Sequence, residues 1–126
     1  MRTKGNGLVR REAIPASSLV PDGEHPARLA EQFTFANAFG ERLGFLYEVE
    51  GGPHAGAVLV QSAVRSPSPT GKLAEILRDL VGRDPTPDEL LEGIGEEYLG
   101  LPCRVLTREE RNRAGKRYSA VQRVSR

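Results

Sequence analysis

Residues 43–64, LGFLYEVEGGPHAGAVLVQSAV, constrain the fold more than any other stretch of this sequence. From Leu43 to Val49 the large apolar residues fall mainly on odd positions, and this period of two favours a half-buried strand over a helix. The run from Ala57 to Val60 is continuous and rich in β-branched residues. Turn residues that suit a chain reversal separate the two runs: Gly51, Gly52, Pro53 and Gly56. The stretch therefore predicts a hairpin of two strands.

Two further segments have strand character. In residues 24–35 one parity is apolar and predicted to face the core, and it comprises Ala27, Leu29, Phe33 and Phe35. The other parity is predicted to face solvent, and it comprises Arg28, Ala30, Gln32 and Thr34. Near the end of the chain, residues 101–107 and 116–124 predict a second hairpin, joined by a long charged loop over residues 108–115.

Between the two hairpins the apolar period changes to that of a helix. Apolar residues spaced three and four apart predict an amphipathic helix: Leu73, Ile76, Leu77, Leu80 and Val81. We expect Ser68 to cap its start and Gly82 to end it in a left-handed conformation. A shorter helix is predicted after Thr86, with Pro87 at its first position and Glu89 completing a capping box.

The predicted order is three strands, a helix region and two strands. This is the order of the OB-fold, a five-stranded, partly open Greek-key barrel, so the fold class is mainly β with one or two helices. Residues 22–126 are expected to form this single OB-fold-like domain. Residues 1–21, dense in Gly, Pro and Ser, are expected to form a flexible arm whose basic residues either bind nucleic acid or form an ordinary solvated tail.

Composition narrows the class of protein. No window of the sequence approaches the ~20 apolar residues of a membrane span, the N-terminus has no signal-like apolar core, and the single cysteine, Cys103, cannot form an internal disulfide. We therefore expect a cytoplasmic protein without membrane association. The net charge of +1 hides an acidic segment at residues 84–97 and a strongly basic stretch from Arg104 onward. An anion-binding surface is expected near the second hairpin.

The residues do not form a recognisable catalytic motif. His25, His54 and Cys103 lack metal-ligand spacing, and residues 69–73, PTGKL, lack the first Gly and the Ser or Thr of a phosphate-binding loop. Glu48 and Glu50 share a wet face, where paired carboxylates are usually only solvated. We therefore expect a protein that is not an enzyme and that uses no cofactor and no metal.

Several segments together resemble a known group of proteins. They are GEHPARL at 23–29, FLYEVEGGPHAG at 45–56, SPS at 66–68 leading to Lys72 and to LVGR at 80–83, and GLPCRV at 100–105. Over roughly residues 22–124 the chain resembles small OB-fold-like proteins of phages, plasmids and other mobile elements. That group is mostly uncharacterised, and some members are labelled single-stranded-DNA-binding or replication-associated. The resemblance implies an accessory protein of replication or recombination.

An OB-fold binds oligonucleotides across its second and third strands, between two flanking loops. On this chain the predicted nucleic-acid-binding residues are Phe39, Arg42, Gln61, Arg65, Arg108, Arg111, Arg113, Lys116 and Arg117. We expect Phe39 to be tucked under the sheet, and the alternative is a stacking platform for a ligand. The predicted ligand is single-stranded DNA, with RNA left open. The alternative function is a protein-interaction or assembly module that uses its barrel edges, as in a homo-oligomer.

Overall fold

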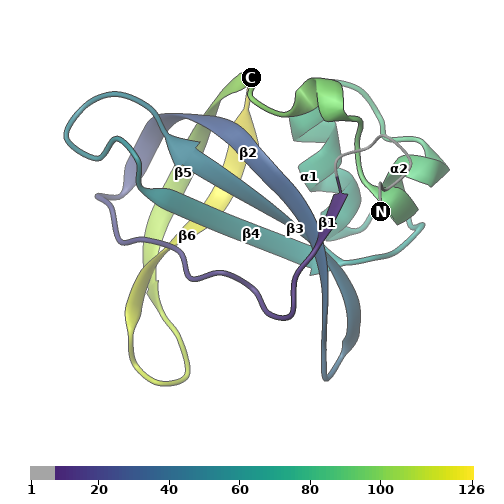
Figure 1. Ribbon diagram of the computed structural model, residues 1–126, viewed down its shortest axis with the longest axis horizontal. Coiled ribbons are helices and arrows are strands. Elements are labelled where there is room, and N and C mark those ends of the chain that lie inside the picture. Colours follow the sequence, from purple (N-terminus) through teal and green to yellow (C-terminus); the bar gives the residue numbers. More distant parts are fainter. Residues whose placement is uncertain (1–7) are drawn as a thin grey trace.

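The computed structural model describes residues 8–126, which form one open, six-stranded sheet with two α-helices (Figure 1). The strands are β1 (Leu8–Arg10), β2 (Gly23–Asn37), β3 (Gly40–Val49), β4 (Val58–Val64), β5 (Pro102–Arg111) and β6 (Arg117–Ser125). The helices are α1 (Lys72–Val81), α2 (Pro87–Glu92) and a short 3₁₀ turn, η1 (Glu96–Tyr98). The predicted mainly β class is confirmed. The structure has six strands where the sequence predicts five, because β1 lies within the predicted N-terminal arm.

The order of strands across the sheet is β4-β3-β2-β5-β6, with antiparallel neighbours throughout, and β1 pairs in parallel with β2. The long strand β2 belongs to both halves of the sheet. Its residues 23–28 pair with β5, and its residues 27–37 pair with β3. It therefore links the two hairpins predicted from the sequence into one curved surface (Figure 1).

A register shift in β2 reverses which side chains face the core. Leu29 pairs with Tyr47, but Glu31 pairs with Leu46, so one residue of β2 is left over between them. Beyond this bulge the buried side chains Gln32 and Thr34 share the face of the main core, whereas Phe33 and Phe35 pack with Val60 in a separate cluster on the other face. The prediction that Phe33 and Phe35 share a face with Leu29 is wrong, because a bulge inverts the alternation.

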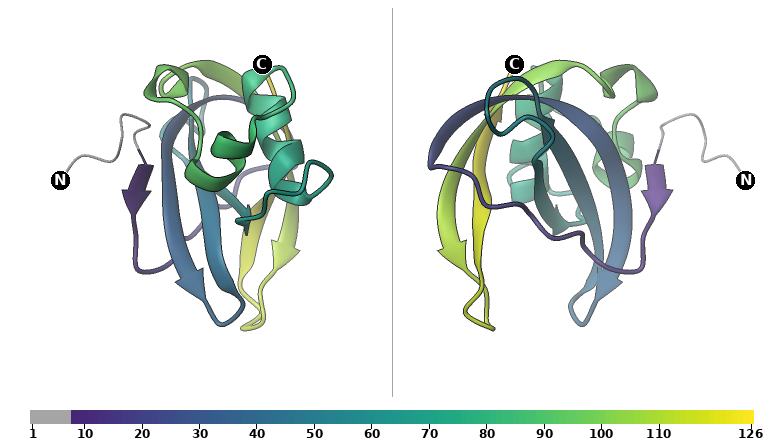
Figure 2. Two further views of the ribbon diagram at one scale, coloured as in Figure 1. Left: turned by 90° about the vertical axis from the view of Figure 1, so that its right-hand side faces the viewer. Right: turned by 60° about the vertical axis from the view of Figure 1, so that its left-hand side comes forward.

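The main core lies between the sheet and α1. The predicted apolar stripe of α1, including Leu73, Leu77 and Leu80, is buried, and the helix contacts both β4 and β6 (Figure 2). Gly82 caps the end of α1 at a φ of 77°, as predicted. Ser68 does not cap its start: α1 begins after Gly71, and the Ser68 hydroxyl instead accepts a hydrogen bond from the Thr70 amide at 3.3 Å.

Residues 8–21 pack on the sheet, where the sequence predicts a flexible arm; residues 1–7 of that arm lie outside the described residues. We call residues 11–21 the crossing segment, because they run from β1 past the edge of β4 to β6 (Figure 1). The Ser18 amide donates to the Val58 carbonyl at 2.7 Å, and the Ser18 carbonyl accepts from the Ser119 amide at 3.1 Å. The crossing segment thus joins the two outer strands of the sheet.

Candidate nucleic-acid interface

Two hairpins project from the same side of the molecule (Figures 1 and 2). In the turn between β2 and β3, the Asn37 side chain accepts a hydrogen bond from the Phe39 amide at 2.9 Å. In the turn between β5 and β6, the Asn112 side chain accepts one from the Lys116 amide at 2.9 Å, and Gly115 has a φ of 82°. Both turns are therefore ordered by their own Asn side chains. We call them the β2–β3 tip (residues 37–40) and the β5–β6 tip (residues 112–116).

Phe39 stands out from the β2–β3 tip. Its side chain is 82% exposed, so the expectation that it is tucked under the sheet is wrong. The Asn37 turn places residue 39 beyond the last pairs of the ladder, where the sheet offers no surface to cover the ring. An exposed phenylalanine on an ordered turn is suited to stacking against a flat ligand.

The predicted charged loop is shorter than expected, because β5 continues to Arg111 and pairs with Arg117. Two of the predicted cations are already engaged. Arg117 makes two hydrogen bonds to Glu109, at 2.7 and 2.9 Å, and these lower the pKa of the Glu109 carboxyl. Arg111 donates to the Gly115 carbonyl at 2.9 Å and so helps to hold the turn.

Three predicted cations near the β5–β6 tip remain available. Among residues 8–126 the side chains of Arg108, Arg113 and Lys116 have no hydrogen-bond or ion-pair partner, and all three residues are exposed. A free guanidinium or ammonium group can pair with a phosphate without first giving up an internal partner. These three cations and Phe39 are the part of the predicted site that the structure leaves free to bind a ligand.

The predicted residues of β3 and β4 have different roles. Gln61 is buried and accepts a hydrogen bond from the Tyr47 hydroxyl at 2.6 Å, so it faces the interior and does not belong to a binding surface. Arg65 donates to the Leu91 carbonyl and lies 3.6 Å from Glu41, which ties the end of β4 to α2. Arg42 is half-buried and lies along β4 at 3.3 Å from the Ser62 hydroxyl.

Sequence reasoning missed the apolar cluster of Phe33, Phe35 and Val60 and the way it is covered. Arg11 of the crossing segment lies over the Phe33 ring, 5.6 Å from its centre, and also pairs with Glu31. Glu31 is the one charged residue on the parity predicted to face the core, and it marks the position where the alternation changes. The sheet face beside the two tips is therefore occupied by the chain's own N-terminal region.

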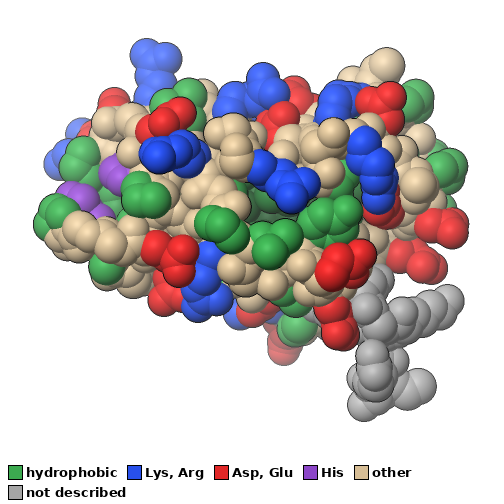
Figure 3. Space-filling view, turned by 90° about the horizontal axis from the view of Figure 1, so that it is seen from above, with side chains coloured by type: hydrophobic (Ala, Val, Ile, Leu, Met, Phe, Trp, Pro, Cys, Tyr) green, Lys and Arg blue, Asp and Glu red, His purple; other side chains and the backbone are tan. Residues whose placement is uncertain are grey.

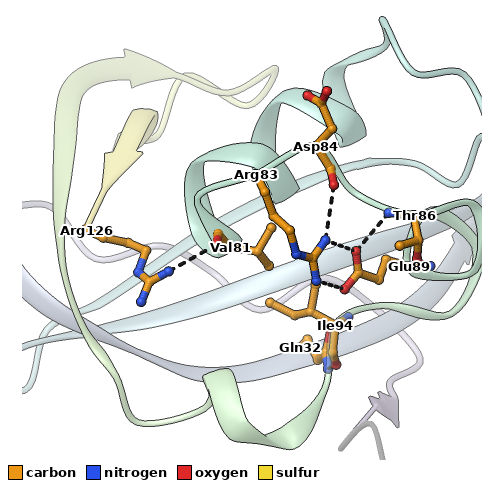
Figure 4. A network of polar contacts seen from close by, with 8 residues as sticks. All are labelled: Gln32, Val81, Arg83, Asp84, Thr86, Glu89, Ile94 and Arg126. Atoms are coloured by element: carbon orange, nitrogen blue, oxygen red, sulfur yellow. Dashed lines mark hydrogen bonds and ion pairs between the residues drawn. The ribbon is translucent and has the colours of Figure 1, made fainter.

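A larger hollow than the space beside the β5–β6 tip lies elsewhere, and its charged side chains are paired. A cavity of about 480 Å³ between the end of α1 and β5–β6 is lined by several arginines. However, Arg123 pairs with Asp79 at 2.8 Å, and Arg78 pairs with Asp84 at 2.8 Å. Figure 4 shows that Arg126 donates to the Val81 carbonyl, at 3.1 Å. On the face that carries the C-terminus, basic and acidic side chains are interspersed (Figure 3). This cavity offers no comparable set of free cations.

Residue types associated with catalysis or metal binding are dispersed. Burial raises the pKa of the Cys103 thiol to about 11, with Glu50 adding to the effect, so the thiolate is scarce near neutral pH. His25 and His54 lie edge to face with ring centres 6.3 Å apart, and His25 bonds the Pro21 carbonyl. Within residues 8–126 no group of three or more His, Cys, Asp or Glu is placed to hold a metal ion.

The comparisons with known proteins identify no family for this chain. No protein-family model matches the sequence, and a search of curated proteins finds no match. In the part of the chain that the structure describes, neither helix has the length and apolar character needed to cross a membrane.

Proposed function

We propose that this chain binds single-stranded nucleic acid between its two hairpin tips, as an OB-fold-like protein. The proposal rests on two features of the same side of the molecule. Phe39 is exposed on one tip, and the free cations Arg108, Arg113 and Lys116 lie at or next to the other. Single-stranded nucleic acid is bound by stacking its bases on aromatic side chains while basic groups follow its phosphates. Both requirements are met on the side from which the tips project.

The connectivity supports the same ligand. Leaving aside the short β1, the chain has three strands, a helix region and two strands, and β2 pairs with both β3 and β5; this agrees with the Greek-key order expected of an OB-fold. In that architecture two loops, which here are the two tips, flank the ligand. The crossing segment covers the outer face of β3 and β4 here, so the proposed contacts are those of the tips. The proposed ligand is single-stranded DNA, and RNA is the alternative.

The alternative, assembly through free sheet edges, has less support. Ser17 and Ser18 side chains accept hydrogen bonds from the Val60 and Val58 amides, at 2.8 and 3.1 Å, on the outer edge of β4. The β6 edge is engaged through Ser119 and the Ser18 carbonyl. Backbone groups that would pair with a second chain are therefore already paired at these positions.

The test is anisotropy with a labelled oligo-thymidine at low and physiological salt. We expect binding that weakens steeply with salt, because counterions are released from the phosphates. The double variant Arg108→Ala/Arg113→Ala should bind at least about fivefold more weakly and reduce the salt slope by about 1.4, since each single-strand phosphate contact contributes about 0.7. Phe39→Ala should weaken binding by about 1–3 kcal/mol at any salt concentration.

The matched control is Arg78→Ala/Arg104→Ala, which removes the same charge from the far cavity and should leave binding nearly unchanged. Equal losses in both double variants would mean that only net charge matters, and the tips would not be the site. Absence of binding at low salt would overturn the proposal, and a concentration-dependent sedimentation coefficient would then favour assembly.

A further inference from the structure

A small pocket lies where the crossing segment meets the β5–β6 tip. Its volume is about 270 Å³, and its apolar walls come from Ile14, Pro15 and Ala16 of the crossing segment and from Val60 of β4. Tyr118, near the start of β6, contributes an aromatic ring to the lining. The pocket thus combines an aromatic side chain with several apolar ones, as ligand-binding pockets generally do.

The polar groups of the pocket are donors. The Asn112 oxygen already accepts from the Lys116 amide, so the side-chain NH₂ is the part of Asn112 left to bind a ligand. The Lys116 ammonium has no partner among residues 8–126. The Ser17 oxygen accepts from the Val60 amide at 2.8 Å and keeps its own proton to donate. A ligand that fits must therefore present acceptors.

Hydrogen bonds made by its own lining residues and by the adjoining Ser18 hold the pocket in shape. Ser17 and Ser18 fix the crossing segment to β4 through the Val60 and Val58 amides, and Pro15 restricts the backbone just before them. On the opposite side the Tyr118 hydroxyl lies 3.4 Å from Glu110, which limits rotation of the ring. A preformed pocket loses little conformational entropy when a ligand enters.

We propose that this pocket binds one pyrimidine base of the single strand, thymine or uracil in preference to adenine; this inference rests on the proposed function. A thymine or uracil ring is flat, is apolar on both faces and carries two carbonyl acceptors, O2 and O4, on either side of one N–H donor. Adenine has an amino donor at the position of O4, and this donor would meet the donors of Asn112 and Lys116. The phosphate of the same nucleotide would lie near Lys116 and the neighbouring Arg113, whose charges are free.

The experiment compares labelled oligo-thymidine and oligo-adenosine of equal length. The unchanged protein should bind oligo-thymidine about tenfold more tightly. Tyr118→Leu, which removes the ring and keeps an apolar side chain, should weaken oligo-thymidine binding by about tenfold and leave oligo-adenosine binding nearly unchanged. The control Tyr98→Leu removes a tyrosine of η1, outside this pocket, and should preserve the preference.

Photo-crosslinking of a bromodeoxyuridine oligonucleotide to the unchanged protein gives a readout independent of variant folding. A crosslink at Tyr118, identified by mass spectrometry, is expected. Binding without a thymidine preference and with crosslinks only at other residues would overturn the pocket while leaving the proposed function intact. Absence of any oligonucleotide binding would overturn both.

Discussion

Gly44 in β3 has a specific partner across the sheet. The register of β2 and β3 places Phe33 opposite Gly44, and a Cβ atom added at Gly44 would overlap the Phe33 ring. The ring is fully buried, and Arg11 lies over it, so it has little room to move away. The glycine is therefore required here by close approach of a side chain rather than by an unusual backbone angle.

We predict that Gly44→Ala lowers the free energy of unfolding by about 1–3 kcal/mol, the usual cost of overpacking, measured by urea denaturation. Gly71→Ser is the control, because a Cβ there meets Ser68 at an ordinary 3.8 Å and serine is a favourable N-cap, so no loss is expected. In a Phe33→Leu background the cost of Gly44→Ala should shrink. An undiminished cost would mean that the ring is not the cause.

The face of β2 shows how far the sequence predicts residue environments. Alternation correctly placed Ala27 and Leu29 in the core, because the ladder is regular up to that point. Alternation wrongly predicts that Gln32 faces solvent. The bulge turns Gln32 inward, where it donates to the Ile94 carbonyl and accepts from the Ile94 amide at 3.0 Å (Figure 4). A polar side chain can be buried there because a distant loop supplies its partners.

At the scale of elements, local capping signals predict the start of α2 but not that of α1, which Ser68 does not cap. The capping box of α2 is confirmed: the Thr86 side chain accepts from the Glu89 amide at 3.2 Å, and Glu89 accepts from the Thr86 amide at 2.9 Å. β1 was missed because its three residues carry no pattern of their own and depend on pairing with β2. The extension of β5 to Arg111 depends in the same way on β6.

Glu89, in the short helix α2, makes the stability of the fold depend on pH. Arg83 makes two hydrogen bonds to the Glu89 carboxylate, both 2.9 Å, and these hold the pKa of Glu89 below its ordinary value of 4.5 (Figure 4). A carboxyl whose pKa is lower in the folded than in the unfolded state stabilises the fold above the unfolded pKa. That stabilisation is lost as the pH falls through the folded pKa.

We therefore predict that Glu89→Gln is less stable than the wild-type protein at pH 7 and that the difference shrinks as the pH falls below the ordinary glutamate pKa of 4.5. Glutamine can still complete the capping box, so the variant tests the effect of the carboxylate charge separately from that of the cap. Urea unfolding at several pH values measures this. Glu12→Gln, at a carboxylate without an ion pair among residues 8–126, should show no such convergence. A difference that stays constant down to pH 3 would contradict the linkage.

At the scale of the whole molecule, the candidate site depends on the relative placement of two turns and the crossing segment. The sequence predicted the residues of each tip, because turn chemistry and charge are local. It did not predict that Phe39 is exposed, that Arg117 is neutralised by Glu109, or that residues 14–17 line a pocket with Tyr118. The first two depend on details of hairpin geometry that alternation does not encode. The pocket arises from long-range pairing, which no single stretch of sequence encodes.

The crossing segment completes the fold, because Val20 is buried in the main core and the Ser119 hydroxyl bonds both its amide and its carbonyl, at 2.8 and 3.1 Å. We predict that deleting residues 1–21 lowers the free energy of unfolding by at least about 3 kcal/mol, from lost apolar burial and unpaired buried groups. Deleting residues 1–7 keeps all of these contacts and is the control. Unfolding in urea measures both. If the longer deletion were as stable as the shorter one, residues 22–126 would fold independently and the crossing segment would serve only to line the pocket.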